Sequence, residues 1–237
     1  MKNLNTALVT GSGRGIGKEL AILLAKKGLN LVLCSRTKSE IDSAASSIES
    51  TSNSQVISRV CDVSVSSQVN DLIKESLNKF GHIDALINNA GITYVKKLVD
   101  TTEQEWNQTL DINLKGVFLF SKAILPTMIS NNFGVIVNVC SGAGKVGFED
   151  ISAYCASKFG MIGLSESLSL EIAKYNIRIM SICPGEVATK MQENVDKNYY
   201  ELNKHKMLHP KIVAEKIVDM IFDDKKYRNG VSVDLPN

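Results

Sequence analysis

Short apolar segments alternate with longer amphipathic segments along almost the whole chain, and this alternation limits the fold more than any other feature. The apolar segments are rich in Val, Ile and Leu, as expected for strands that are buried on both faces of a sheet. They lie at 7–9, 31–34, 56–60, 85–87, 135–139, 177–182 and 231–233. Each of these segments predicts one β-strand.

The segments between these strands carry apolar residues at helical spacing. They lie at 15–27, 41–48, 65–80 and 153–174, and another begins at Pro210. Thr102 and Glu105 have the spacing of a capping box, which predicts the start of one more long helix. Alternating strands and helices indicate a parallel sheet covered by helices on both faces. We therefore predict a single α/β domain over 1–237, a doubly wound Rossmann-type fold whose seven-stranded parallel sheet has the order 3-2-1-4-5-6-7.

A glycine-rich turn joins the first predicted strand to the first predicted helix. Glycine tolerates positive φ and lets another backbone approach closely, while the amides and dipole of a helix N-terminus favour a phosphate group. The strand–turn–helix context makes this turn a candidate pyrophosphate site. The candidate residues are Gly11, Ser12, Gly13, Arg14, Gly15, Ile16 and Gly17.

Further motifs follow in order along the chain. The turn reads TGxxxGxG, the segment 88–91 reads NNAG, and Tyr154 and Lys158 form YxxxK. With these motifs the chain resembles the short-chain dehydrogenase/reductase family along nearly its whole length. The resemblance implies hydride transfer between a nicotinamide dinucleotide and a carbonyl or alcohol. It also implies additional cofactor contacts from Asp62, which lies beside the adenine in the family, and from Val63, Asn89, Ala90, Gly91, Pro184, Gly185, Val187 and Thr189.

Tyr154 and Lys158 are four residues apart on a predicted helix, so their side chains share one face. A nearby ammonium favours the ionised form of a phenol, which helps the phenol to exchange a proton with an alcohol or carbonyl near neutral pH. Ser141 lies at the carboxyl end of a strand, where doubly wound sheets bind ligands, and its hydroxyl is a candidate donor to the substrate oxygen. The resemblance further implies that Lys158 holds the nicotinamide ribose and that Asn113 fixes a proton-relaying water.

The cofactor preference depends on the residues that follow the second strand. NAD requires an acidic residue there to bind the ribose hydroxyl, and none occurs before Glu40. Arg36 instead offers a planar donor fork that suits a phosphate, and Arg14 in the glycine turn can approach the same phosphate from the other side. In the family, basic residues at these two positions accompany NADP(H). We therefore predict NADP(H) as the cofactor.

We predict a reductase that uses NADPH to convert a ketone into a secondary alcohol, with Tyr154 as the proton donor. The nearest resemblance is to 3-oxoacyl (acyl-carrier-protein) thioester reductases, through the segments 88–93 and 105–107. Those proteins commonly end in a strand followed by paired glycines, whereas this chain ends VSVDLPN. A sugar, a pteridine or a small ketone is therefore an alternative substrate, and an alcohol dehydrogenase is an alternative activity. A non-catalytic NADPH-binding scaffold is disfavoured because Tyr154 and Lys158 are both present.

Charge, composition and cysteine pattern exclude other classes of protein. A net charge of +2 gives no strong attraction to nucleic acid or to an anionic membrane. The chain has no run of about 18 apolar residues and no signal-peptide pattern at its N-terminus. The five cysteines form no CxxC pair, so we expect reduced thiols, no metal site and a cytoplasmic protein. Cys140, Cys155 and Cys183 lie beside expected site residues, but buried cysteine is more often a small hydrophobe.

Two further expectations concern assembly and motion. Apolar residues occupy much of the circumference of the segment 156–170, which suits burial on more than one side. We expect a homo-oligomer, a tetramer or else a dimer, with a small-molecule carbonyl or alcohol as its substrate. The segment 189–209 is polar and lysine-rich, and we expect it to act as a mobile lid.

Overall fold

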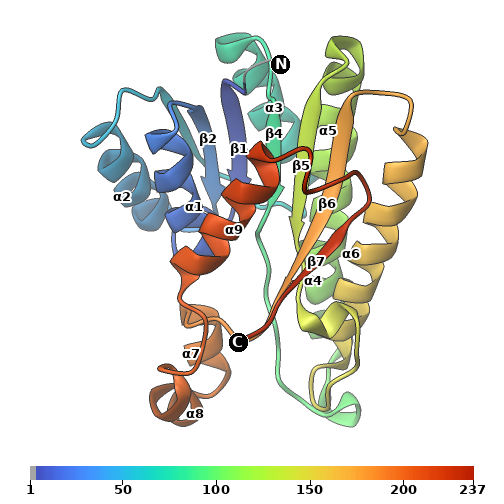
Figure 1. The fold of residues 1–237 in the computed structure, drawn as a ribbon. Helices are drawn as coiled ribbons and strands as arrows, with labels where there is room; N and C mark the ends of the chain where they lie inside the picture. The colour runs from blue at the N-terminus through green and yellow to red at the C-terminus, as the bar shows by residue number, and fades with distance from the viewer. Residues whose placement is uncertain (1–3) are drawn as a thin grey trace.

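The computed structural model describes residues 4–237, and its centre is one parallel sheet of seven strands. The strand order is β3-β2-β1-β4-β5-β6-β7, which confirms the predicted order and fold class. Figure 1 shows helices on both sides of this sheet. The strands are β1 (Thr6–Thr10), β2 (Asn30–Ser35), β3 (Val56–Val60), β4 (Ala85–Asn88), β5 (Gly134–Val139), β6 (Ile177–Pro184) and β7 (Ser232–Leu235).

The helices connect these strands and also extend beyond the sheet at its carboxyl edge. Within the described residues the α-helices are α1 (Gly15–Lys26), α2 (Lys38–Glu49), α3 (Ser66–Phe80), α4 (Glu103–Leu110), α5 (Gly116–Asn131), α6 (Ser152–Glu171), α7 (Lys190–Val195), α8 (Lys197–Asn203) and α9 (Pro210–Phe222). Because each parallel strand must return to the same edge, its connection crosses a face of the sheet. The chain therefore covers both faces with helices.

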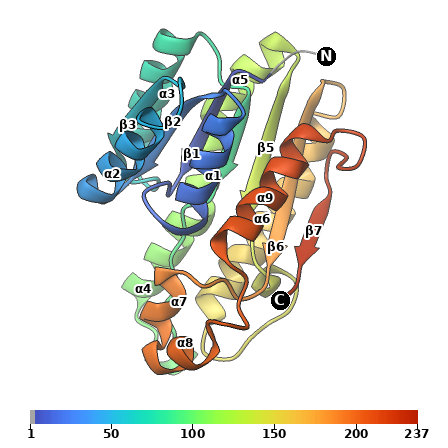
Figure 2. The same ribbon diagram turned by 60° about the vertical axis from the view of Figure 1, so that its left-hand side comes forward.

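The sheet separates two apolar cores, because successive residues of a strand point to opposite faces. In β1, Ala7 and Val9 pack with residues of α1, α2 and α9, whereas Leu8 packs with residues of α3 and α5. Figure 2 shows α1 and α9 side by side over the first of these faces. Every residue of β1 and of β5 is buried, in agreement with the apolar runs Ala7–Val9 and Val135–Val137 at their centres.

The predicted segments agree closely with the observed elements. β3 covers the predicted Val56–Val60, and α9 begins at Pro210 as predicted. The capping box of α4 is present, since Thr102 Oγ1 accepts from the Glu105 amide and the Glu105 carboxylate accepts from the Thr102 amide. The segment 189–209 is more regular than expected, because it contains α7 and α8.

A continuous helical stretch of 29 residues runs from Glu103 to Asn131 and includes α4, a π-helical turn at Asp111–Lys115 and α5. Among the residues that the structure describes, it is the one helix that is long and apolar enough to cross a membrane by length and composition alone. Of its most apolar window, 44% is buried inside the molecule, where Phe120, Ile124 and Met128 belong to an apolar core. We therefore interpret this stretch as a core helix.

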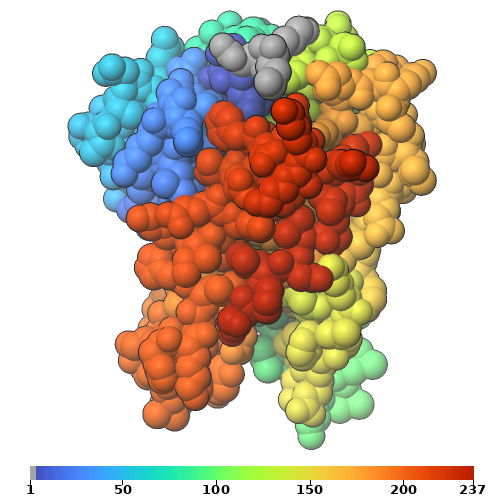
Figure 3. Space-filling model, viewed as in Figure 1, coloured from blue at the N-terminus to red at the C-terminus, as the bar shows by residue number. Residues whose placement is uncertain are grey.

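The carboxyl ends of the strands define one end of the molecule, which is the lower end in Figure 1. Helices α4, α7 and α8 lie beyond this end. Figure 3 shows that the surface is hollowed here, between the orange α7–α8 segment and the yellow segment that follows β5. Ligands of doubly wound sheets bind at this edge, so the hollow is the expected ligand-binding site.

Candidate active site

A cavity of about 530 Å³ opens at the carboxyl ends of the strands. It is lined by the glycine turn, by the ends of β2 to β6, and by residues of α6 and α7. The sequence-predicted residues that line it are Gly11, Gly13, Arg14, Gly15, Ile16, Arg36, Asp62, Val63, Asn89, Ala90, Gly91, Ser141, Tyr154, Lys158, Pro184, Gly185, Val187 and Thr189. Three others, Ser12, Gly17 and Asn113, are not part of the lining. The chain thus brings most of the predicted site residues around one space.

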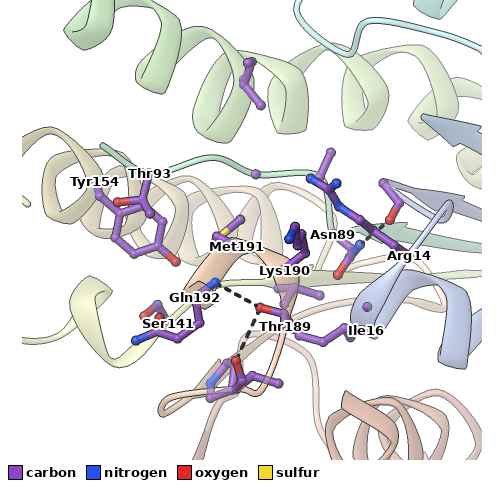
Figure 4. Close-up of a pocket in the computed structure, with 18 of the residues that line it drawn as sticks. Arg14, Ile16, Asn89, Thr93, Ser141, Tyr154, Thr189, Lys190, Met191 and Gln192 are labelled. Atoms are coloured by element: carbon purple, nitrogen blue, oxygen red, sulfur yellow. Dashed lines mark hydrogen bonds between the residues drawn. The ribbon is translucent and has the colours of Figure 1, made fainter. Parts of the chain in front are cut away.

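Figure 4 shows that the cavity has two chemically different ends. Arg14 and Asn89 lie at one end, whereas Ser141 and Tyr154 lie at the other. The segment from Thr189 to Gln192 lies between them. Thr189 Oγ1 accepts from the Gln192 amide and caps α7, which fixes this part of the wall. The arrangement suits an elongated ligand with a charged end and a reactive end.

Hydrogen bonds join the glycine turn to the turn that follows β4. Thr10 Oγ1 accepts from the amides of Asn89 and Ala90, at 3.0 Å each. In return, Asn89 Nδ2 donates to the carbonyl oxygens of Thr10 at 2.9 Å and of Gly11 at 3.1 Å. Arg14, at the N-cap of α1, makes no side-chain capping bond. The first amides of α1 therefore lack a side-chain cap and are available to a phosphate group.

Two glycines of this turn are required by close contacts. Gly11 has φ +64°, and a Cβ there would lie 2.9 Å from the Cα of Ala90. A Cβ at Gly17 would lie 2.4 Å from the carbonyl oxygen of Gly11 and 2.6 Å from Asn89 Nδ2. Gly17 is thus packed behind the turn and outside the cavity lining, and its predicted contact with the cofactor stays a prediction. Ser12 also lies behind the lining, where its hydroxyl is fully buried and donates to the Cys34 carbonyl at 3.3 Å.

We expect Gly17→Ala to lower the free energy of unfolding by about 1–3 kcal/mol, because the added methyl group overpacks the turn. Nucleotide affinity should fall with it, since the methyl group would push apart the Gly11 carbonyl and the Asn89 side chain. Urea unfolding and nucleotide titration measure the two effects. Gly147→Ala is the matched control, because a Cβ at Gly147 meets nothing within 4 Å. Equal stability of the two variants would contradict this packing role.

The charged end of the cavity holds two arginines and one carboxylate. Arg36 follows β2, is exposed and faces the cavity. Arg14 forms an ion pair with Glu40, with 3.0 Å between Nη1 and Oε1. Glu40 also lines the cavity, and its side chain is 32% exposed. No sequence pattern indicates this pair, because 26 positions separate its members. The site therefore carries its own anion where an incoming phosphate would meet Arg14.

At the reactive end, Lys158 is almost completely buried, with 3% of its surface exposed. Its ammonium donates to the Val139 carbonyl at 2.8 Å and lies 5.5 Å from the centre of the Tyr154 ring. An ammonium has three hydrogens to donate, so this bond leaves two for other partners. Ser141 caps the short turn at Gly142–Gly144 through its hydroxyl, which accepts from the Ala143 amide at 3.1 Å. Both side chains are therefore held in place by the strand β5 and its following turn.

Asn113 occupies a supporting position behind the cavity. It lies in the π-helical turn and is fully buried. Its Oδ1 accepts from the Ile92 amide at 2.8 Å, and its Nδ2 donates to the Ile92 carbonyl at 2.9 Å and to Ser157 Oγ at 3.0 Å. The Asn113 side chain thus fixes the segment after β4 against α6. Its side chain lies directly behind the lining, since a Cβ at Gly91 would lie 3.3 Å from Asn113 Oδ1 and 3.9 Å from Lys158 Nζ, and its catalytic role stays a prediction.

Some residues of the cavity lining belong to no sequence motif and were not predicted. Thr93 lies beside Tyr154 in Figure 4, and its buried Oγ1 has no hydrogen-bond partner. Glu186 joins the two helices of the segment 189–209, because its carboxylate accepts from Gln192 Nε2 at 3.1 Å and from the Tyr199 hydroxyl at 3.0 Å. Further apolar residues of the cavity lining are Val95, Phe148, Ile151, Met191 and Val195. Their positions depend on long-range folding, so the sequence alone did not indicate them.

Comparison with known proteins gives concordant results. The family model described as short chain dehydrogenase matches residues 5–200. A 3-oxoacyl-[acyl-carrier-protein] reductase of Thermotoga maritima is 33% identical over 228 residues, which are 94% of this chain and 92% of that protein. A D-beta-hydroxybutyrate dehydrogenase of Rhizobium meliloti is 34% identical over 189 residues, 79% of this chain and 73% of that protein. The crystal structure of levodione reductase has a TM-score of 0.92 and 29% identity, and covers 98% of this chain and 95% of its own.

Proposed function

This chain belongs to the short-chain dehydrogenase family, and within that family we propose that it is an NADPH-dependent reductase that converts a ketone into a secondary alcohol. Membership makes the protein an oxidoreductase that uses a nicotinamide cofactor. One observation carries the finer proposal. Tyr154 and the buried ammonium of Lys158 stand together at the end of a cavity that begins at the glycine turn, with 5.5 Å between the ammonium and the ring centre.

Tyr154, Ser141 and Lys158 have different roles in the proposed reduction. Bound NADPH supplies the hydride for the carbonyl carbon. Tyr154 donates the proton to the carbonyl oxygen, and Ser141 donates a hydrogen bond to that oxygen as negative charge develops on it. The ammonium of Lys158 favours the phenolate that remains after proton transfer. Its remaining hydrogens also suit a ribose hydroxyl at the same end of the cavity.

The preference for NADPH over NADH follows from the charged end. Arg36, which follows β2, and Arg14, in the glycine turn, both line the cavity. Two such groups bind a phosphate by charge-assisted and bidentate hydrogen bonds. Glu40 is paired with Arg14 rather than placed to accept from a ribose hydroxyl. The 2′-phosphate of NADPH can therefore bind the Arg36 guanidinium, a contact that NADH cannot make.

The substrate proposed here is a 3-oxoacyl thioester or a related ketone. The apolar residues of the cavity lining, among them Phe148, Ile151, Met191 and Val195, suit a carbon chain better than a sugar. The 3-oxoacyl reductase from Thermotoga maritima supports the same class by its similarity. The second candidate activity is oxidation of a small hydroxy acid, which the similarity to the hydroxybutyrate dehydrogenase supports.

A carbonyl panel tested with NADPH and with NADH examines this proposal directly. We expect NADPH absorbance to fall with a 3-oxoacyl thioester, and to fall much more slowly with a sugar or a pteridine. NADH should support the same reduction at a lower kcat/KM, because it lacks the 2′-phosphate. Failure of NADPH to reduce any member of the panel would refute the ketoreductase, while a preference for NADH would refute the cofactor assignment alone.

We also propose that the protein is a cytoplasmic homo-oligomer. Phe118 on α5 is 44% exposed, and Phe159 and Leu170 on α6 are 47% and 77% exposed. Exposed apolar side chains on two long helices suit burial against a second copy of the chain. The five buried free cysteines agree with a reducing compartment. Light scattering that reports a single chain would contradict the oligomer.

A further inference from the structure

Two cysteines lie side by side at the carboxyl ends of β5 and β6: Cys140 directly follows β5, and Cys183 is the penultimate residue of β6. β5 and β6 pair in parallel with Val139 opposite Ile182. Cys140 follows Val139 and Cys183 follows Ile182, so the two cysteines are also opposite each other. Opposite side chains of adjacent parallel strands lie on the same face of the sheet. The strands are about 4.8 Å apart, which lies within the Cα separation of about 4.4–6.8 Å that a disulfide requires.

The two thiols influence each other. The neighbouring Cys140 lowers the pKa of the Cys183 thiol, while the same contact and burial raise the pKa of Cys140. Cys183 Sγ also lies 3.4 Å from Ser232 Oγ, and the Lys145 ammonium favours its ionised form. Thiolates are the reactive form of cysteine. Cys183 is therefore suited to attack a sulfur on Cys140 once that sulfur is oxidised.

Cys140 is coupled to the residues proposed for catalysis. It immediately precedes Ser141, and its Sγ lies 3.3 Å from the carbonyl oxygen of Lys158. A Cβ at Gly144 would lie only 2.6 Å from that sulfur, so the turn that carries Ser141 is packed closely on Cys140. Any bond that draws the sulfur toward Cys183 must move this turn. Cys140 also lines the cavity, so a small oxidant that enters the cavity reaches it.

A second pair of cysteines provides an internal comparison. Cys34 and Cys61 lie at the ends of β2 and β3, and their thiols also interact. The register places Cys34 opposite Arg59 and Ser35 opposite Val60, so Cys61 stands opposite the residue after Ser35. Cys34 and Cys61 are thus diagonal neighbours, about 7–8 Å apart between Cα atoms. That separation exceeds what a disulfide spans without backbone movement.

We propose that Cys140 and Cys183 are a redox modification site, which forms a reversible disulfide with two-electron thiol oxidants and thereby inactivates the enzyme. Both S–H bonds break and one S–S bond forms. The two protons and two electrons pass to the oxidant, which is a peroxide reduced to water or an azo compound reduced to a hydrazine. In a reducing compartment such a bond is transient, so the pair reports oxidising conditions. Inactivation rests on the proposed ketoreductase, whereas the disulfide itself does not.

The first experiment tests the bond without reference to activity. The purified protein is treated with the azo compound diamide, then denatured, and its free thiols and its intact mass are measured. We expect the wild type to lose two of its five thiols and to yield a linked peptide that contains Cys140 and Cys183. Cys183→Ser should keep all its thiols, and Cys34→Ser, the matched control, should still lose two. An unchanged wild type, or loss of two thiols in Cys183→Ser, would overturn the proposal.

The second experiment tests the consequence. Each protein is compared with its own untreated rate of NADPH-dependent ketone reduction. Diamide should lower the wild-type rate by about tenfold or more, since displacement of a catalytic group by about 1 Å has effects of this size or larger, and dithiothreitol should restore it. Cys183→Ser should not respond to diamide. A complete disulfide with an unchanged rate would refute inactivation, while a disulfide in a protein that reduces no ketone would refute only the proposed function.

Discussion

Tyr154→Phe is expected to lower kcat for ketone reduction by about 10²- to 10⁴-fold, the range that a positioned proton donor contributes. The substitution removes one hydroxyl and keeps the ring, so the packing of α6 should be preserved. Lys158 would keep its bond to the Val139 carbonyl, because that bond does not involve Tyr154. Binding of NADPH should therefore change little while proton transfer to the carbonyl oxygen fails.

The measurement is a single-turnover rate of NADPH oxidation with the best ketone of the panel, together with the Kd for NADPH. Tyr175→Phe is the matched control, because Tyr175 lies outside the cavity lining. It should keep the wild-type rate. If Tyr154→Phe reduces the ketone as fast as the wild type, another group donates the proton. If it loses NADPH binding instead, Tyr154 acts mainly in holding the cofactor.

The alternation of apolar strands with amphipathic helices carried enough information to predict the fold. Strands that are apolar on both faces must be covered on both sides. Few folds other than a parallel sheet between two layers of helices provide this cover. Elements without such a pattern were not predictable. α7 and α8 form in a polar segment, where Thr189 and Asp196 cap them and Glu186 joins them. These contacts are local, but the segment lacks the apolar periodicity from which the other helices were predicted.

The motifs of the site were predictable where backbone geometry requires one residue type. Gly11 needs its positive φ and its contact with Ala90, so a glycine there is informative without a structure. Contacts between side chains far apart in sequence were not predictable. The ion pair of Arg14 with Glu40 and the juxtaposition of Cys140 with Cys183 depend on which strands become neighbours and in which register. The sequence contains the residues of such pairs but not their proximity.

Arg36→Ala is expected to raise the Kd for NADPH by about 10- to 100-fold, because a hydrogen bond to a charged group contributes about 1.5–3 kcal/mol. The Kd for NADH should change little, since Arg36 is exposed and would meet only the 2′-phosphate that NADH lacks. The ratio of the two dissociation constants is therefore the informative quantity. Fluorescence titration of each nucleotide measures it, and an equal loss of affinity for both would place Arg36 outside 2′-phosphate recognition.

Glu40→Gln should act in the opposite direction. In the wild type, the Glu40 carboxylate lies 3.0 Å from the Arg14 guanidinium. The 2′-phosphate must therefore compete with this carboxylate for Arg14. The amide keeps the shape of the side chain but removes its charge, so Arg14 becomes available and like-charge repulsion with the phosphate disappears. Both side chains are partly exposed, so we expect a gain in NADPH affinity of only a few-fold, of the order of 0.5–1 kcal/mol. A loss of affinity in this variant would mean that Glu40 orients Arg14 for the phosphate rather than competing with it.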